Sequence, residues 1–269
     1  MERTLMSLDY PGLLAALHVE SELLTHRLQD LPFEYWGRAT PAQGWSIQDQ
    51  VSHLAFFDDA TKLALTAPDH FAQMAAKLID GGMDFPDRIA EQHRILAPEA
   101  LMSWFSAARQ ELLTLFANSD PKRRVPWFGP DMSVASSATA RLMETWAHGH
   151  DIYEALGVEH PATPGLRSIA HLGVSTFAFS HRLNGLDVPG EPVGVQLHSP
   201  EGQTWTWGPQ DTANTVVGAA QDFVLTVTQR KHWTETGLTV NGAVATGWME
   251  IAQAFAGAAS KRKPKVQQR

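Results

Sequence analysis

The sequence contains no cysteine. This absence excludes disulfide bonds, zinc sites built on thiolates and a cysteine nucleophile. If the protein takes part in thiol chemistry, the thiol must therefore come from a cosubstrate.

The sequence also lacks a long apolar run and an excess of positive charge. No stretch approaches the roughly 18 apolar residues of a membrane-spanning helix, and the N-terminal "MERTLMSLDYPGLL" lacks the continuous apolar segment and cleavage site of a signal peptide. The formal net charge is −8, so no general attraction to nucleic acid or anionic membranes is expected. We therefore expect a cytoplasmic protein, a monomer or a homodimer, with neither nucleic acid nor membrane as a partner.

Several common catalytic motifs are missing too. The sequence has neither a P-loop nor a G-x-G-x-x-G pattern. Ser175 in "GVSTF" lacks the second glycine of a nucleophile elbow. The letters "HGHD" from His148 to Asp151 lack the spacing and the additional histidine of the H-x-H-x-D-H motif of metallo-β-lactamase-like hydrolases. These motifs therefore assign neither a serine nucleophile nor a nucleotide-binding loop.

Helix signals dominate the first 160 residues. Asp9 is a suitable N-cap for the first long helix, and Ser46 with Asp49 forms a capping-box pattern at the start of another. Two further amphipathic helices cover "APEALMSWFSAARQELLTLFA" and "SVASSATARLMETWAHGHDIYEALG", the latter ending at Gly157. These four principal helices predict a helical bundle over residues 1–160.

The pattern changes in the second half of the chain. We expect a helix over 166–183, a hairpin formed by "VGVQLHS" and "QTWTWG", a helix over 212–228, a short strand in "GLTVNG" and a final helix. These elements predict a smaller α+β domain over 161–258. Residues 259–269 form a basic tail that is expected to be disordered and solvated, the alternative being a contact with nucleic acid or membrane.

The helix "RLMETWAHGHDIYEALG" carries a possible metal-binding pair. Glu144 and His148 are four residues apart, so a carboxylate and an imidazole can converge on one ion. Arg141 and Asp151 lie one turn further out on the same side and can orient the ligands. His150 points to nearly the opposite side, where we expect it to be solvent-exposed or packed between the two domains. Alone, the pair is weak evidence for a metal site, because exposed Glu/His pairs are common on helices.

A metal site needs a third ligand, and His53 is the best candidate. It lies inside a capped helix among apolar residues, where an unpaired imidazole is costly. The alternative is a core histidine bonded to a backbone carbonyl.

Tryptophans at helical positions are expected to be core residues. These are Trp45, Trp104 and Trp146. Trp127, in a loop before the helix of Glu144, can instead line a substrate pocket.

The two segments "GWSIQDQVSHLAFFDDA" and "RLMETWAHGHDIYEALG" together resemble a known family. They are similar to the DinB/YfiT-like metal-binding bundles, and more narrowly to the N-terminal domain of actinobacterial mycothiol-dependent maleylpyruvate isomerases, over residues 8–158. The resemblance implies that His53, Glu144 and His148 are the metal ligands, and Asp151 matches a family aspartate. The phrases "TWTWGPQDTA", "DFVLTVTQRKH" and "WMEIAQAFAG" resemble a C-terminal domain that has been likened to a wyosine-base-formation domain.

The resemblance also implies a function. Two histidines and a carboxylate suit Zn²⁺ with one open position, although Ni²⁺, Fe²⁺ and Mn²⁺ also accept such ligands. Related bundles use low-molecular-weight thiols such as mycothiol, so we expect a thiol S-transferase or isomerase that uses a metal-bound thiolate on a small, carboxylate-bearing molecule. Arg230, in "VTQR", is expected by analogy to hold a substrate carboxylate, the alternative being a contact with its own helix end. A zinc-dependent hydrolase using metal-bound hydroxide and a non-enzymatic metal- or ligand-binding protein are the competing hypotheses.

Overall fold

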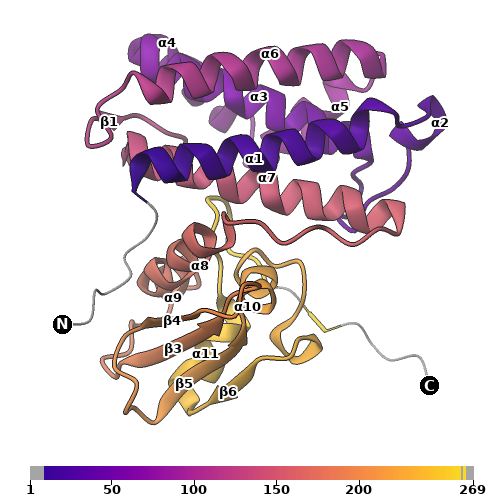
Figure 1. The fold of residues 1–269 in the computed structure, drawn as a ribbon. Coiled ribbons are helices and arrows are strands. Elements are labelled where there is room, and N and C mark those ends of the chain that lie inside the picture. The colour runs from indigo at the N-terminus through magenta and orange to yellow at the C-terminus, as the bar shows by residue number, and fades with distance from the viewer. Residues whose placement is uncertain (1–8, 262, 265–269) are drawn as a thin grey trace. The chain divides into compact units, whose positions relative to one another are not determined.

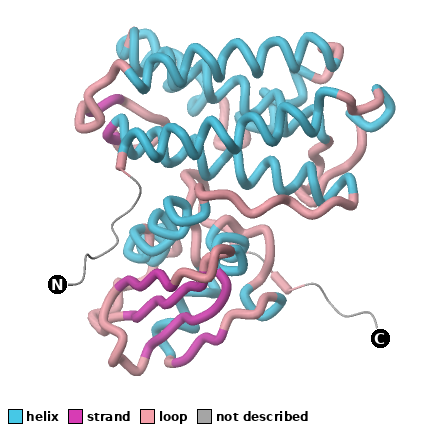
Figure 2. The backbone as a smooth tube through the Cα atoms, viewed as in Figure 1, coloured by secondary structure: helices cyan, strands magenta, loops and turns pink. Residues whose placement is uncertain are grey.

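The computed structural model describes residues 9–261, 263 and 264. They form two compact units, one from Asp9 to Thr163 and one that begins at Pro164. The first is a helical bundle and the second combines helices with a four-stranded sheet, as the predicted fold class requires (Figure 2). Part of the predicted basic tail, Arg262 and residues 265–269, lies outside the described residues.

Four long helices build the first unit. Each of α1 and α3 packs against both α6 and α7, which gives a four-helix bundle (Figure 1). Shorter elements occupy the connections between the long helices. The elements of this unit are α1 (Tyr10–Gln29), α2 (Phe33–Trp36), α3 (Ile47–Thr66), α4 (Pro68–Asp80), α5 (Phe85–His93), α6 (Pro98–Ala117), β1 (Arg124–Val125), β2 (Met132–Ser133) and α7 (Val134–Leu156).

The expected helix boundaries are confirmed where capping signals were present. The Asp9 carboxylate accepts a hydrogen bond from the Gly12 amide at 2.8 Å. Ser46 and Asp49 form the capping box of α3. Helix α7 ends at Gly157, whose φ of 70° is the left-handed conformation that glycine adopts without steric cost. The short helix α5 was not among the predicted helices.

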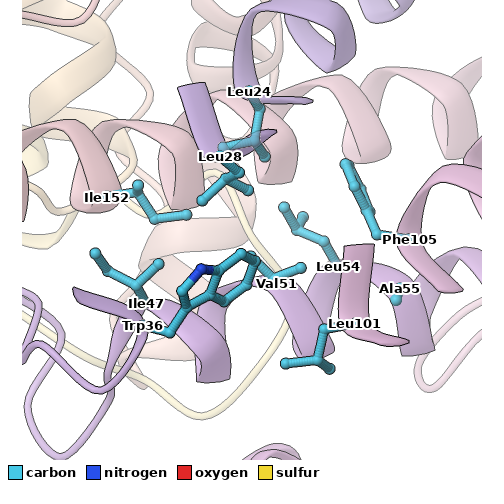
Figure 3. Packing of buried hydrophobic residues seen from close by; sticks show 10 residues of the cluster. All are labelled: Leu24, Leu28, Trp36, Ile47, Val51, Leu54, Ala55, Leu101, Phe105 and Ile152. Atoms are coloured by element: carbon cyan, nitrogen blue, oxygen red, sulfur yellow. The ribbon is translucent and has the colours of Figure 1, made fainter. Parts of the chain in front are cut away.

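An apolar core holds α3 in register with its neighbours. Val51 and Leu54 of α3 are fully buried against residues of α1, α6 and α7 (Figure 3). Burial of each such aliphatic side chain stabilises the fold by about 1.5–3 kcal/mol. His53 lies between these two residues in sequence, so the same packing fixes the position from which its side chain projects.

The second unit contains a sheet of strand order β4-β3-β5-β6. Strands β3 and β5 pair in parallel, and the two outer pairs are antiparallel. The expected hairpin is confirmed, with Leu197 of β3 opposite Trp205 of β4. The elements of this unit are α8 (Leu166–Ser175), α9 (Phe177–Leu183), β3 (Val193–His198), β4 (Thr204–Trp207), β5 (Asn214–Ala219), α10 (Ala220–Val227), η1 (Trp233–Glu235), β6 (Thr239–Asn241) and α11 (Ala243–Ile251).

Two predicted helices of this unit are wrong in detail. The helix expected over 212–228 is a strand up to Ala219 and a helix only from Ala220. Pairing of β5 on both sides overrides the local helical pattern, and Gly218 marks the place where a Cβ atom would lie 2.8 Å from the Leu238 side chain. The helix expected over 166–183 is interrupted at Thr176, whose hydroxyl donates to the Gly173 carbonyl at 2.9 Å.

Among the described helices, none is long and apolar enough to cross a membrane.

Candidate metal centre

The fold brings His53, Glu144 and His148 together in the bundle. Their potential ligand atoms all lie within 4.8 Å of one another. A single carboxylate oxygen, Glu144 Oε2, is 2.9 Å from His148 Nε2 and 3.4 Å from His53 Nε2. Helix α7 supplies the expected i, i+4 pair and α3 supplies the third residue.

The first turn of α3 is held by an ion pair between the buried Asp49 and the partly exposed Arg94. Arg94 donates from Nε and Nη2 to the two carboxylate oxygens of Asp49 at 2.9 and 3.0 Å, and Asp49 also caps the helix through Ser46. Burial alone would raise the pKa of Asp49, but the hydrogen bonds from Arg94 and Ser46 lower it below its ordinary value. Because Asp49 is one turn before His53, this network fixes the helix end from which the histidine projects.

Gln50 orients His148 and was not anticipated as a site residue. Its side chain is fully buried, and its Oε1 accepts a hydrogen bond from His148 Nδ1. The amide orientation follows from the next contacts: the Thr40 hydroxyl donates to the Trp45 carbonyl at 3.0 Å, so it accepts from Gln50 Nε2 at 2.7 Å. His148 therefore carries its proton on Nδ1, and Nε2 presents a lone pair toward Glu144.

The charge distribution of the cluster formed by His53, Glu144 and His148 is suited to a cation. Burial lowers the pKa of His53 to about 4, with the neighbouring His148 acting in the same direction against Glu144. Although burial would raise the pKa of Glu144, its contacts with His148 and His53 hold it well below the usual range. An ionised carboxylate oxygen thus lies at short distance from two imidazole nitrogens, and these contacts can stabilise a proton or a metal ion that lies between them.

A further observation on His53 supports a divalent metal ion as the group that these residues hold. His53 Nδ1 is buried and has no hydrogen-bond partner among the described residues, so this imidazole is not the core histidine bonded to a carbonyl that the sequence left open. Two imidazole nitrogens and a carboxylate are the ligand set of catalytic zinc sites, which leave one position open.

Aromatic rings surround the two histidines. The Trp45 ring centroid is 5.1 Å from that of His53 and 5.8 Å from that of His148, with which it stacks. The expectation that Trp45 is a core residue is therefore wrong, since it is half-buried beside the site and donates from Nε1 to Asp87 at 2.6 Å. Phe57 covers another side of His53, at 4.5 Å between centroids.

The other tryptophans follow the expectation more closely. Trp146 is 1% exposed and belongs to the core, whereas Trp104 packs at the edge of the core. Trp127 stacks on Phe71 at 5.7 Å and approaches Phe57 at 6.2 Å. It is thus one ring removed from His53, and its contact with a substrate stays a prediction.

His150 lies outside the cluster of potential ligands. Its side chain is only 12% exposed, its ring stacks on Trp146 at 5.4 Å, and its Nε2 is 3.6 Å from a Glu154 carboxylate oxygen. The expectation of solvent exposure is wrong, because the aromatic core of the bundle extends to this face of α7.

Three further residues were predicted from the sequence to take part in the site, and the structure shows the surroundings of each. Asp151 is 3% exposed on α7. Arg141 is 2% exposed, and its nearest ion-pair partner is Asp58. Arg230, in the second unit, is half-buried and donates from Nη1 to the carbonyl of Thr228, the C-cap of α10, at 2.8 Å. This contact is the one expected of an arginine at its own helix end, and the role of Arg230 toward a substrate stays a prediction.

The sequence of the chain was compared with models of known protein families. The family model described as the mycothiol maleylpyruvate isomerase N-terminal domain matches residues 17–153. The chain belongs to this family. The match covers just over half of the chain and includes His53, Glu144 and His148. The family resemblance of the bundle is thereby confirmed, whereas the likeness of the second unit to a wyosine-base-formation domain stays a prediction.

Individual relatives extend the similarity over both units. Two Mycobacterium tuberculosis proteins, Rv0036c of strain H37Rv and MT0041 of strain CDC 1551, are each 42% identical over 92% of this chain and 96% of their own, and their names state no function. Crystal structures of the mycothiol-dependent maleylpyruvate isomerase and of a histidine-to-alanine mutant match with TM-scores of 0.56 and 0.59. Each shares 16% identity and covers 87% of this chain and 93% of its own. At 16% identity, the structural match shows only that this chain has the same fold as the isomerase.

Proposed function

We propose that the protein is a metal-dependent enzyme that uses a low-molecular-weight thiol such as mycothiol to transform a small, carboxylate-bearing molecule. The reaction is an isomerisation or an S-transfer. The observation that carries the proposal is the convergence of His53 and His148 on one oxygen of Glu144. The family description and the name of the structural relative support the choice of thiol.

The protein's own residues prepare the site for the ion. Gln50 directs the lone pair of His148 Nε2 toward Glu144, and the rings of Phe57 and Trp45 pack against the imidazole of His53. Zn²⁺ suits this ligand set, with Ni²⁺, Fe²⁺ and Mn²⁺ as the other candidates. When bound, such an ion acts as a Lewis acid that lowers the pKa of a thiol or water reaching the open position.

The chain has no cysteine, so the thiol must be a second small molecule. Within the proposal, Asp151 supports the ligands on α7 and Arg230 holds a substrate carboxylate. Both roles rest on the family resemblance and on their residue types.

Metal analysis of the purified protein tests the proposal. We expect about one divalent ion per chain, lost in both His53→Ala and His148→Ala while circular dichroism shows that the helices are kept. His150→Ala is the matched control, because it removes a histidine of the same helix and should leave the metal content unchanged. Full occupancy in both ligand variants would refute the site.

A thermal-shift screen of the metal-loaded protein then tests the thiol. Mycothiol or a related thiol should raise the melting temperature of the metal-loaded protein and leave the metal-free protein unchanged. An activity that proceeds without any thiol would favour the competing zinc hydrolase. A bound ion with no stabilisation by any thiol and no activity would favour a binding protein.

A further inference from the structure

A buried arginine next to the proposed metal centre has unused hydrogen-bond donors. Arg141 is 2% exposed, and its Nε and Nη2 have no hydrogen-bond partner among the described residues. Its Nε is 3.4 Å from Asp58 Oδ1, an ion pair that lacks hydrogen-bond geometry. A buried guanidinium with free donors costs stability, so its retention calls for a functional reason.

The nearby Arg109 already satisfies Asp58. Arg109 donates from Nε and Nη2 to the two carboxylate oxygens at 2.7 and 3.1 Å, and from Nη1 to Ser21 and to Thr145 Oγ1. Asp58 thus has a bidentate partner of opposite charge without Arg141. The second arginine is surplus to this structural ion pair.

Arg141 lies on the same face of α7 as the proposed ligands. It precedes Glu144 by three residues and His148 by seven, which places all three along one stripe of the helix. Its guanidinium is 5.9 Å from the ring centroid of Phe57, whose ring contacts His53.

The charges of the cluster balance only when no metal is bound. Asp58 and Glu144 contribute two negative charges and Arg109 and Arg141 two positive ones, all in the bundle interior. A divalent ion therefore leaves an excess of two positive charges in a buried region. An anionic ligand offsets this excess, whereas a neutral one does not.

We propose that Arg141 binds the carboxylate of the molecule that occupies the metal centre. The inference rests on the proposed function and names the anion-binding residue of that site. Nε–H and Nη2–H lie on one edge of the guanidinium and point in parallel, which is the fork that accepts a carboxylate through two hydrogen bonds. Arg141 is the bundle's own anion-binding group, separate from Arg230 of the second unit.

Calorimetry on the zinc-loaded protein tests this assignment with three probes. 3-Mercaptopropionate carries a thiol and a carboxylate, 2-mercaptoethanol only the thiol, and propionate only the carboxylate. In Arg141→Met, the affinity for 3-mercaptopropionate and for propionate should fall about 10- to 100-fold, the range that two charge-assisted hydrogen bonds contribute. The affinity for 2-mercaptoethanol should stay within about twofold, since no hydrogen bond to Arg141 is lost. Arg141→Lys, which keeps the charge but not the fork, should recover part of the loss.

Two measurements separate this role from a structural one. Zinc affinity, measured by chelator competition, should be equal or higher in Arg141→Met, because a like charge near the ion is removed. The melting temperature of the metal-free variant should be equal or higher, since an unsatisfied buried charge is gone. Arg109→Met is the matched control and should lower the melting temperature, because it leaves Asp58 without its bidentate partner.

The outcomes are distinct. Equal losses for all three probes in Arg141→Met, or a fall in zinc affinity and melting temperature like that of Arg109→Met, would overturn the inference. If the wild-type protein binds zinc and propionate but no thiol, the proposed function fails. The propionate affinities of the wild-type protein and Arg141→Met still decide the role of Arg141 in that case.

Discussion

The bundle contains two buried carboxylate–imidazole clusters that differ in how completely they are satisfied. Glu20 accepts from the Thr163 hydroxyl at 2.8 Å and lies 2.8 Å from His160 Nε2, while His160 Nδ1 donates to the Pro161 carbonyl at 2.9 Å. The side chains of Glu20 and His160 are each 1% exposed. Every polar atom of this cluster has a partner.

The Glu144 cluster is incomplete by the same measure. Two histidines share one carboxylate oxygen, His53 Nδ1 has no partner among the described residues, and the Glu144 side chain is 22% exposed. The same residue types thus form a closed structural contact in one place and an open set of donors in the other. This difference, and not the residue types alone, marks the Glu144 cluster as the candidate metal site.

The largest expected effect is on the free energy of unfolding, which should fall much more in Glu20→Ala than in Glu144→Ala. Glu20→Ala leaves His160 and Thr163 without their buried partner and should lower the free energy of unfolding by about 3–5 kcal/mol. Glu144→Ala should cost about 1 kcal/mol or less in metal-free protein, because its histidines retain Gln50 and solvent as partners. Urea denaturation in the presence of a chelator measures both. Similar losses in the two variants would remove the distinction.

Zinc should narrow the difference in stability between Glu20→Ala and Glu144→Ala. At a free zinc concentration of about 100 times the dissociation constant, binding should stabilise the wild-type protein by about 2.7 kcal/mol. Glu20→Ala should gain the same increment over its own metal-free value, and Glu144→Ala should gain almost none. The measurement is the same denaturation with and without zinc. An equal gain in all three proteins would place the zinc elsewhere.

The residue behind His148 should matter for metal affinity. Gln50→Leu removes the acceptor that fixes the His148 tautomer and should weaken zinc binding by about 10- to 100-fold. Thr163→Val, the corresponding change behind Glu20, should leave zinc affinity unchanged and cost about 1 kcal/mol of stability. Chelator competition gives the affinities. Unchanged zinc binding in Gln50→Leu would show that the imidazole is oriented by other contacts.

The smallest expected effect concerns the aromatic cover. Trp45→Phe keeps an aromatic ring over the histidines but loses the hydrogen bond to Asp87, so zinc affinity should fall by only about two- to fivefold, the equivalent of one net hydrogen bond. The change in tryptophan fluorescence on zinc binding should largely disappear in this variant, since Trp45 is the indole that stacks on His148. A fluorescence response of full size in the variant would assign it to another tryptophan.

The sequence predicted the parts of the site that local rules control. Glu144 and His148 share a helix face because of their spacing, and the Ser46–Asp49 capping box fixed where the helix of His53 begins. The role of Gln50 depends on a contact with a residue 98 positions away, which no local pattern encodes. Trp45 precedes the helix, and its position over the histidines is set by the turn in which it lies.

The prediction of the fold likewise succeeded where local signals decide the structure and failed where distant contacts decide it. Helices with capping signals were placed closely, whereas β5 was mistaken for helix because its strand character comes from pairing with β3 and β6. Gly218 was the available signal, since a glycine inside a predicted helix is unfavourable. Arg141 was foreseen as a residue supporting the ligands, but its unused donors become apparent only once Arg109 is seen to satisfy Asp58.

The most direct test of the metal centre is a crystal structure of the zinc-loaded protein with anomalous diffraction at the zinc edge. We expect one strong peak at about 2.0–2.2 Å from His53 Nε2, His148 Nε2 and a Glu144 oxygen, with a fourth position open to solvent or thiol. His148 Nδ1 should still donate to Gln50. A protein that binds zinc stoichiometrically with its anomalous peak elsewhere, or with the Glu144 cluster closed by direct hydrogen bonds alone, would contradict the account.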